Sequence, residues 1–338
     1  MIARRLVPFT LVLAPFLTLP TSPATAQEVV VYSARKEELI RPAFDAFTRE
    51  TGIRVTLLTG KAGELARRVE IERESPLGDV FIGTAAGITE LIRAKGLLAV
   101  YRGAALKDVP EEFRAPDASW VGVTARARVL IYNTQLVKEA PTSFFELTDA
   151  RWKGKVAVAS MGERTTVGWL AAILHQKGEE FTSRYVQALR ANGLRILGNN
   201  TDVRKAVARG EFTVGITNHY YYLLQLQENP NSPVGIVYPD QGPDQMGTPV
   251  FSITAAILRG AKHPDEAQRL IDFLLSPKGN RLLVEGEFEL PILPAVSPVG
   301  GDKGVKSLGR FKKTPVTQAQ LADLEPKVEK LYGALFVP

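Results

Sequence analysis

The chain has 338 residues, with 42 Lys and Arg against 36 Asp and Glu, and it contains no cysteine. The absence of cysteine excludes disulfides, a thiolate metal site and the lipid anchor of a bacterial lipoprotein. The formal charge of +6 falls to +4 without the two arginines near the N-terminus and is spread along the chain. This weak excess argues against a nucleic-acid partner.

The first segment has the pattern of a targeting sequence. Arg4 and Arg5 precede an apolar run over residues 6–19, and small residues follow at 24–26. This order predicts a cleaved signal peptide over residues 1–26. A membrane anchor is the alternative, but the apolar run is shorter than the roughly 20 residues that a spanning helix needs. We therefore expect an exported protein.

Strand-like and helix-like segments then alternate. Short apolar runs typical of buried strands alternate with segments of helical periodicity. Strands are predicted at 29–32, 53–57 and 79–82, and helices at 37–50, 63–74 and 88–95. In the first helix Ile40, Phe44 and Phe47 recur at helical spacing, and Gly52 follows where a C-cap glycine belongs. This alternation predicts an α/β fold with a mainly parallel sheet.

A second α/β unit is predicted from about residue 124. Its strands are expected at 129–132, 155–159, 212–216 and 250–258, and its helices at 167–175, 202–208 and from 263 onward. About 310 residues remain after the predicted signal peptide, more than a usual single core holds, so we expect two lobes.

Tyr220, Tyr221 and Tyr222 follow the predicted strand 212–216. Ligands of open α/β sheets bind beyond the carboxyl ends of strands. A phenolate is a hard oxygen donor that suits a hard trivalent cation, and its proton must leave on binding. Packing as a buried aromatic cluster is the alternative, and spacing alone favours it.

Two further segments have the character of anion sites. Thr165 and Thr166 lie between the strand 155–159 and the next helix, where free N–H groups bind anions, although either threonine could simply cap that helix. Arg126 and Arg128 alternate along a strand and so share one face. They either point a guanidinium into a cleft or form part of a charged surface.

Enzyme motifs are absent from the sequence. It contains three histidines, at 175, 219 and 263, and no His-rich metal motif, nucleophile elbow or P-loop. Only His219 lies beside the tyrosines. We therefore expect no enzyme, and an extracytoplasmic enzyme using a tyrosine as acid or base is kept as an alternative.

The chain resembles the periplasmic ferric-ion-binding proteins of bacterial ABC importers, a branch of the type II periplasmic binding proteins. The resemblance spans about residues 28–335. It is carried by short motifs at residues 30–35, 78–81, 126–133, 199–203, 209–212, 218–221 and 306–311.

This resemblance implies a site as well as a fold. The family's Asn-x-Tyr-Tyr element corresponds to Asn218 and the paired phenolate ligands Tyr220 and Tyr221. The family pattern also places Asn200 at the site and a synergistic anion at Thr165 and Thr166. From its charge and its place on the strand, Arg126 is a further candidate to hold that anion.

The sequence departs from the family pattern in its first half. Where many relatives carry a His or Tyr ligand, this chain has Lys36 and Glu37, and residues 83–85 offer no glutamate. Glu37 is a hard oxygen donor and is expected as a third metal ligand. The alternatives are that Lys36 balances an anion instead, or that this part of the chain supplies no ligand and anion or water completes the shell, as in some relatives.

The resemblance implies the following function. Fe³⁺ with two phenolates keeps one positive charge, which carbonate, phosphate or a similar anion neutralises. Lobe one is expected at 27–125 plus 250–300 and lobe two at 126–249 plus 301–338, with hinge strands near 121–127 and 248–255. An inner-membrane ABC permease is expected to recognise the form in which the lobes have closed around the ligand. The protein is expected to be a periplasmic monomer.

Two alternatives stay within this fold. One is a binding protein for a small organic or phosphorylated anion, without metal, in which the tyrosines stack on the ligand. The other is a sensor subunit that docks on a membrane receptor.

Overall fold

The computed structural model describes residues 27–338, so the predicted signal peptide lies outside the described residues. The α/β class is confirmed. The first elements alternate as predicted: β1 (Glu28–Ser33), α1 (Glu37–Thr51), β2 (Arg54–Thr59), α2 (Ala62–Ile71), β3 (Val80–Gly83), α3 (Ala86–Ala94) and β4 (Leu98–Ala99).

Helix α1 shows why these elements form where they do. Ile40, Phe44 and Phe47 are buried on one face, and the helix ends at Gly52, whose φ of 74° is left-handed. The Gly52 N–H donates to the Thr48 carbonyl, which satisfies an otherwise free acceptor at the helix end. The predicted helix and its glycine cap are therefore confirmed.

The middle of the chain forms the second α/β unit. Its elements are β5 (Val121–Asn133), β6 (Val156–Ala159), α4 (Arg164–Ala191), β7 (Arg195–Leu197), α5 (Asn200–Ala208), β8 (Val214–Asn218), α6 (His219–Glu228) and β9 (Val234–Val237). Helix α4 is much longer than the predicted segment 167–175. It is interrupted at Gly178, and its second part buries Tyr185, Val186 and Leu189 on one side only, a weaker apolar signal than the first part.

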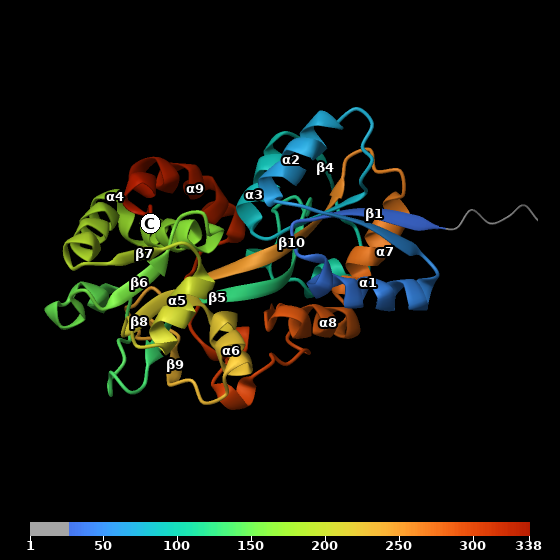
Figure 1. Ribbon diagram of the computed structural model, residues 1–338. Coiled ribbons are helices and arrows are strands. Elements are labelled where there is room, and N and C mark those ends of the chain that lie inside the picture. Colours follow the sequence, from blue (N-terminus) through green and yellow to red (C-terminus); the bar gives the residue numbers. More distant parts are fainter. Residues whose placement is uncertain (1–26) are drawn as a thin grey trace, which may run out of the picture.

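Two long strands join the halves of the molecule. Strand β10 (Val250–Leu258) pairs antiparallel with the first half of β5, up to Ala127. From Arg128 onward β5 pairs instead with β8 and β9. The strand order is therefore β2-β1-β3-β10-β5-β8-β6-β7, with β5 and β10 running between the two groups of helices in Figure 1. The predicted hinge segments coincide with this pair, although hinge motion itself stays a prediction.

The C-terminal elements return to both halves. They are α7 (Pro264–Leu274), α8 (Pro277–Glu287), β11 (Leu290–Pro291) and α9 (Gln318–Tyr332). Helix α8 packs on α1, whereas α9 packs on α4 and also contacts α3 (Figure 1). None of the helices within residues 27–338 is both long and apolar enough to cross a membrane.

Candidate metal and anion site

The register of the second sheet brings distant segments to one edge. Strands β6 and β8 run parallel, so the start of α4 after β6 and the start of α6 after β8 lie at the same edge. Strand β5 runs antiparallel to β8 and places Arg128 opposite Asn218. The predicted anion loop and the tyrosines therefore converge on one place.

Arg128 is the centre of the anion-type cluster. Its Nη1 donates to Asn200 Oδ1 at 3.0 Å, to Asn218 Oδ1 at 3.1 Å and to Thr165 Oγ1 at 3.3 Å. Its Nη2 donates to Thr166 Oγ1 at 3.1 Å. The structure thus brings together four of the five residues that were predicted to bind an anion. The arginine that these four contact is Arg128, and not the predicted Arg126.

This cluster has unused donors. Arg128 and Asn200 are both fully buried, yet Arg128 Nε and Asn200 Nδ2 have no hydrogen-bond partner among the residues that the structure describes. A buried donor without a partner costs about 1–3 kcal/mol. Burial lowers the pKa of Arg128 to about 10, so the side chain keeps its charge at neutral pH. The cluster is therefore suited to an added oxygen acceptor that carries negative charge.

Tyr220 and Tyr221 open helix α6 beside this cluster. Their ring centroids lie 4.3 Å apart with an angle of 31° between the ring planes. Tyr220 and Tyr222 are each 8% exposed and Tyr221 is half-buried, and of the three Tyr222 packs in a hydrophobic core cluster. The two phenol rings thus lie against each other at the start of a short helix.

Both phenols are protonated in the absence of a cation. Burial raises the pKa of Tyr220 well above its usual value, although the charge of Arg126 acts in the opposite direction. Burial, followed by the charge of Glu163, raises the pKa of Tyr221. A strongly charged cation is therefore needed to displace these protons, and its affinity falls as acid competes for the phenolates.

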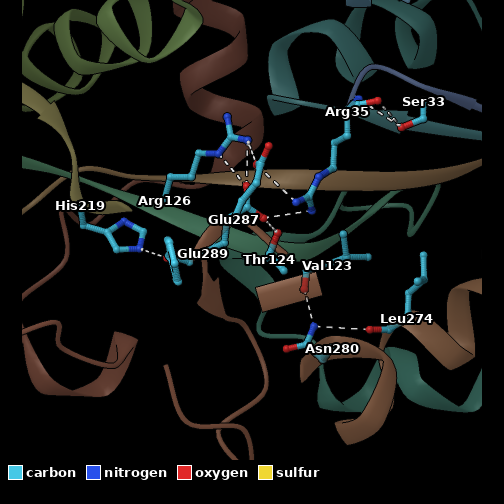
Figure 2. A network of polar contacts seen from close by, with 11 residues as sticks. Ser33, Arg35, Val123, Thr124, Arg126, His219, Leu274, Asn280, Glu287 and Glu289 are labelled. Carbon is cyan, nitrogen blue, oxygen red and sulfur yellow. Dashed lines mark hydrogen bonds and ion pairs between the residues drawn. The ribbon is translucent and has the colours of Figure 1, made fainter. Parts of the chain in front are cut away.

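Arg126 belongs to a second buried network, shown in Figure 2. Its Nε donates to Glu289 Oε1 at 2.8 Å and its Nη2 to Glu287 Oε2 at 3.1 Å. Arg35 binds the same two carboxylates at 3.1 Å and 3.3 Å, and the Thr124 hydroxyl donates to Glu289. The Arg126 guanidinium also lies over the Tyr220 ring, 5.3 Å from its centroid. Arg126 therefore links the tyrosines to two glutamates.

The charges of this network stabilise one another. Burial alone would raise the pKa of Glu289, but Arg35, Arg126 and the Thr124 hydroxyl lower it to about 2. Burial and the charge of Glu289 raise the pKa of Glu287. Burial alone would lower the pKa of Arg126, but the charge of Tyr220 where that phenol is ionised, and those of Glu289 and Glu287, raise it overall. The guanidinium beside Tyr220 is thus always charged.

Sequence reasoning missed this network. Glu287 and Glu289 lie about 160 residues from Arg126 and were not singled out. The signal that was available is their position in an otherwise apolar stretch before Pro291, where two acids need charged partners.

Glu37, the third predicted metal ligand, forms an ion pair with a residue of its own helix. It is exposed in the first turn of α1, and its carboxylate binds Arg41 at 2.5 Å. Its role as a ligand stays a prediction. Within residues 27–338 no group of three or more His, Cys, Asp or Glu side chains is arranged to hold a metal ion.

His219 connects the tyrosine helix to the glutamate network. Its Nδ1 accepts from the Ala127 N–H at 3.2 Å, and its Nε2 lies 2.9 Å from the Phe288 carbonyl (Figure 2). These partners assign the proton to Nε2. Burial lowers the pKa of His219 to about 4, so the ring is neutral and serves as a structural link between β5 and the segment that carries Glu287 and Glu289.

A pH effect on stability follows from His219. Its pKa is lower in the folded chain than in the unfolded chain, so the unfolded state gains the proton first as the pH falls below about 6.5. We expect the free energy of unfolding to lose about 3 kcal/mol from this group between pH 7 and pH 4.

The measurement is denaturant unfolding at both pH values. His219→Gln should show a smaller difference between the two pH values than the parent chain, whereas His175→Gln, at an exposed position, should keep the parent difference. An unchanged difference in His219→Gln would contradict a neutral, buried role for this ring.

Comparison with known proteins identifies relatives along almost the whole chain. Residues 75–312 match the profile of a family described as bacterial extracellular solute-binding proteins. Iron uptake protein A1 of Synechocystis sp. is 32% identical over 310 residues, covering 88% of this chain and 84% of that protein. The Fe(3+)-binding periplasmic protein of Serratia marcescens is 30% identical, with 76% of each chain covered.

Solved structures show the same fold. The Trichodesmium protein IdiA (FutA), in complex with iron and citrate, superposes with a TM-score of 0.83 at 26% identity, covering 91% of this chain and 99% of that one. The fold is thus the two-lobed type II periplasmic binding protein fold, as expected from the sequence. With a family profile that matches well over half of its residues, this chain belongs to the bacterial extracellular solute-binding proteins.

Proposed function

We propose that this protein is the periplasmic solute-binding component of an ABC importer and that its cargo is ferric iron. Tyr220 and Tyr221 supply two phenolates, and an anion binds beside them at Arg128, Asn200 and the two threonines in the first turn of α4. The observation that carries this proposal is the position of two adjacent phenols next to a buried arginine cluster with unused donors. The names of the relatives support the same cargo.

The chemistry of the site favours a hard trivalent cation over a soft one. Phenolate oxygens suit Fe³⁺, and the chain has no cysteine to hold a soft metal. The permanently charged Arg126 over the Tyr220 ring favours the phenolate form of that residue. Loading the site therefore exchanges two phenol protons for one cation.

The proposal includes the architecture around the site. Residues 1–26 act as a cleaved signal peptide, and the lobes comprise 27–125 plus 250–300 and 126–249 plus 301–338. The paired strands β5 and β10 serve as the hinge, because β5 pairs with β10 in the first sheet and then continues into the second sheet, where it pairs with β8 and β9. The closed monomer delivers its cargo to an inner-membrane permease and performs no catalysis, in keeping with its solute-binding family.

Titration of the purified mature protein with ferric citrate tests this function. We expect a visible absorption band from phenolate-to-iron charge transfer that saturates at one iron per chain. A colourless protein that is thermally stabilised by an organic phosphate instead would contradict the iron assignment and support a phosphorylated solute in the same cleft.

A further inference from the structure

A carboxylate of the chain lies beside the anion cluster. Glu163 is the N-cap residue of α4, with φ −87° and ψ 109°, and its side chain makes no capping hydrogen bond to its own helix. Helix N-caps are usually Ser, Thr, Asp or Asn, whose short side chains can reach back to the helix. The Glu163 side chain therefore does not cap α4.

The Glu163 carboxylate reaches the start of the neighbouring helix. Its Oε1 accepts from the Asn200 backbone N–H, the first residue of α5, at 3.4 Å. The starts of α4 and α5 thus meet at this side chain, and both present the positive end of a helix dipole. An external anion is also expected to bind at these two helix starts.

The charge of Glu163 also affects Arg128 and Tyr221. Among the charges around Arg128 it exerts the largest effect, and its charge opposes ionisation of Tyr221. It lies two residues before Thr165 in the loop that was expected to bind the anion. The contact with Asn200, which itself binds Arg128, therefore places the Glu163 carboxylate next to the arginine cluster.

The charges of the site can be counted. Arg35, Arg126 and Arg128 are balanced by Glu163, Glu287 and Glu289 while both phenols are neutral. Fe³⁺ with two phenolates adds a single positive charge to this balanced set. Without Glu163 the loaded site would carry two, and an external anion would have to supply both negative charges.

We propose that Glu163 is a resident anion of the ferric site, which reduces the charge required from an external anion from two to one. This inference rests on the proposed function. It implies that a monovalent anion such as hydrogen carbonate suffices, and that multiply charged anions such as phosphate are repelled from the empty site. The unused donors of Arg128 and Asn200 remain for that single anion.

The test compares iron affinity with and without anions in the mature protein, in Glu163→Gln and in Glu180→Gln. Glu180 lies on the same helix, exposed and paired with Arg184, and serves as the matched control. Affinity is measured by competition with a chelator, first in anion-free buffer and then with hydrogen carbonate or phosphate added. We expect Glu163→Gln to bind iron at least about tenfold more weakly without anions and to regain affinity as anion is added. The parent and Glu180→Gln should respond less to the same addition.

A second measurement uses the iron-free protein. Calorimetric titration with inorganic phosphate should show tighter binding to Glu163→Gln than to the parent, because a like charge has been removed. The parent alone provides a further check, since it should bind iron measurably in anion-free buffer.

Three outcomes would overturn the inference. These are an absolute requirement of the parent for added anion, an equal anion response in parent and Glu163→Gln, and phosphate binding unchanged by the substitution. The failure of the proposed function looks different, because then no variant, with any anion, develops the iron absorption band.

Discussion

Replacing Tyr221 with phenylalanine is expected to weaken ferric binding strongly, and Tyr220→Phe should do the same. Each change removes one phenolate while leaving the ring and its packing in place. The loss of one anionic ligand from a trivalent cation should weaken affinity by roughly a thousandfold, about 4 kcal/mol, or more. The visible charge-transfer band should weaken or vanish with it. Chelator competition and an absorption spectrum measure both effects in the same samples.

The neighbouring residue provides a matched control. Tyr222 follows the pair on the same helix and lies in the core with 8% exposure. Tyr222→Phe removes the same hydroxyl from the next residue and should leave iron affinity and colour unchanged. Full iron affinity in Tyr221→Phe would end the assignment of these phenols as ligands, whatever the control shows.

The second large effect concerns Glu289 and the stability of the protein. Its carboxylate is fully buried and binds Arg35, Arg126 and the Thr124 hydroxyl. Glu289→Gln preserves the shape but leaves two buried guanidinium groups with Glu287 alone. Removing one partner of a buried charge cluster typically costs about 3–5 kcal/mol. We expect a loss of that size in denaturant unfolding at neutral pH.

The same carboxylate predicts a dependence on acid. The pKa of Glu289 is lowered to about 2 in the folded chain, so its stabilisation is complete above its usual pKa and is lost as the pH falls toward 2. Glu289→Gln should therefore differ from the parent strongly at pH 7 and much less at very low pH.

An exposed ion pair is the control for this prediction. Glu28 binds Arg54 at 2.9 Å on the surface, and Glu28→Gln should change stability by less than about 1 kcal/mol. Equal effects of the two substitutions would show that the buried network contributes no more than a surface pair. The bonds from Glu289 would then not be what holds Arg126 over the Tyr220 ring.

Local patterns were sufficient for most of the secondary structure. The buried strand at 79–82 and the helix with Ile40, Phe44 and Phe47 were predicted because a short apolar run and helical spacing depend on neighbouring residues only. The second half of α4, after Gly178, was missed, since its apolar residues cover one side of a mostly polar helix. The resemblance to a known family supplied the ligand roles that periodicity could not.

The sequence by itself determined the α/β class, the two adjacent phenols and the absence of thiolate ligands, because these depend on residue type and short-range order. It also showed that Arg126 and Arg128 share one face of a strand. Only the tertiary structure decided that Arg128 joins the threonines and asparagines while Arg126 joins Glu287 and Glu289. The reason is that β5 changes partners between Ala127 and Arg128. Arg128 then contacts residues up to 90 positions away in the chain, and Arg126 contacts residues up to 163 positions away. Such pairings are set by the packing of whole strands and helices, which no local pattern records.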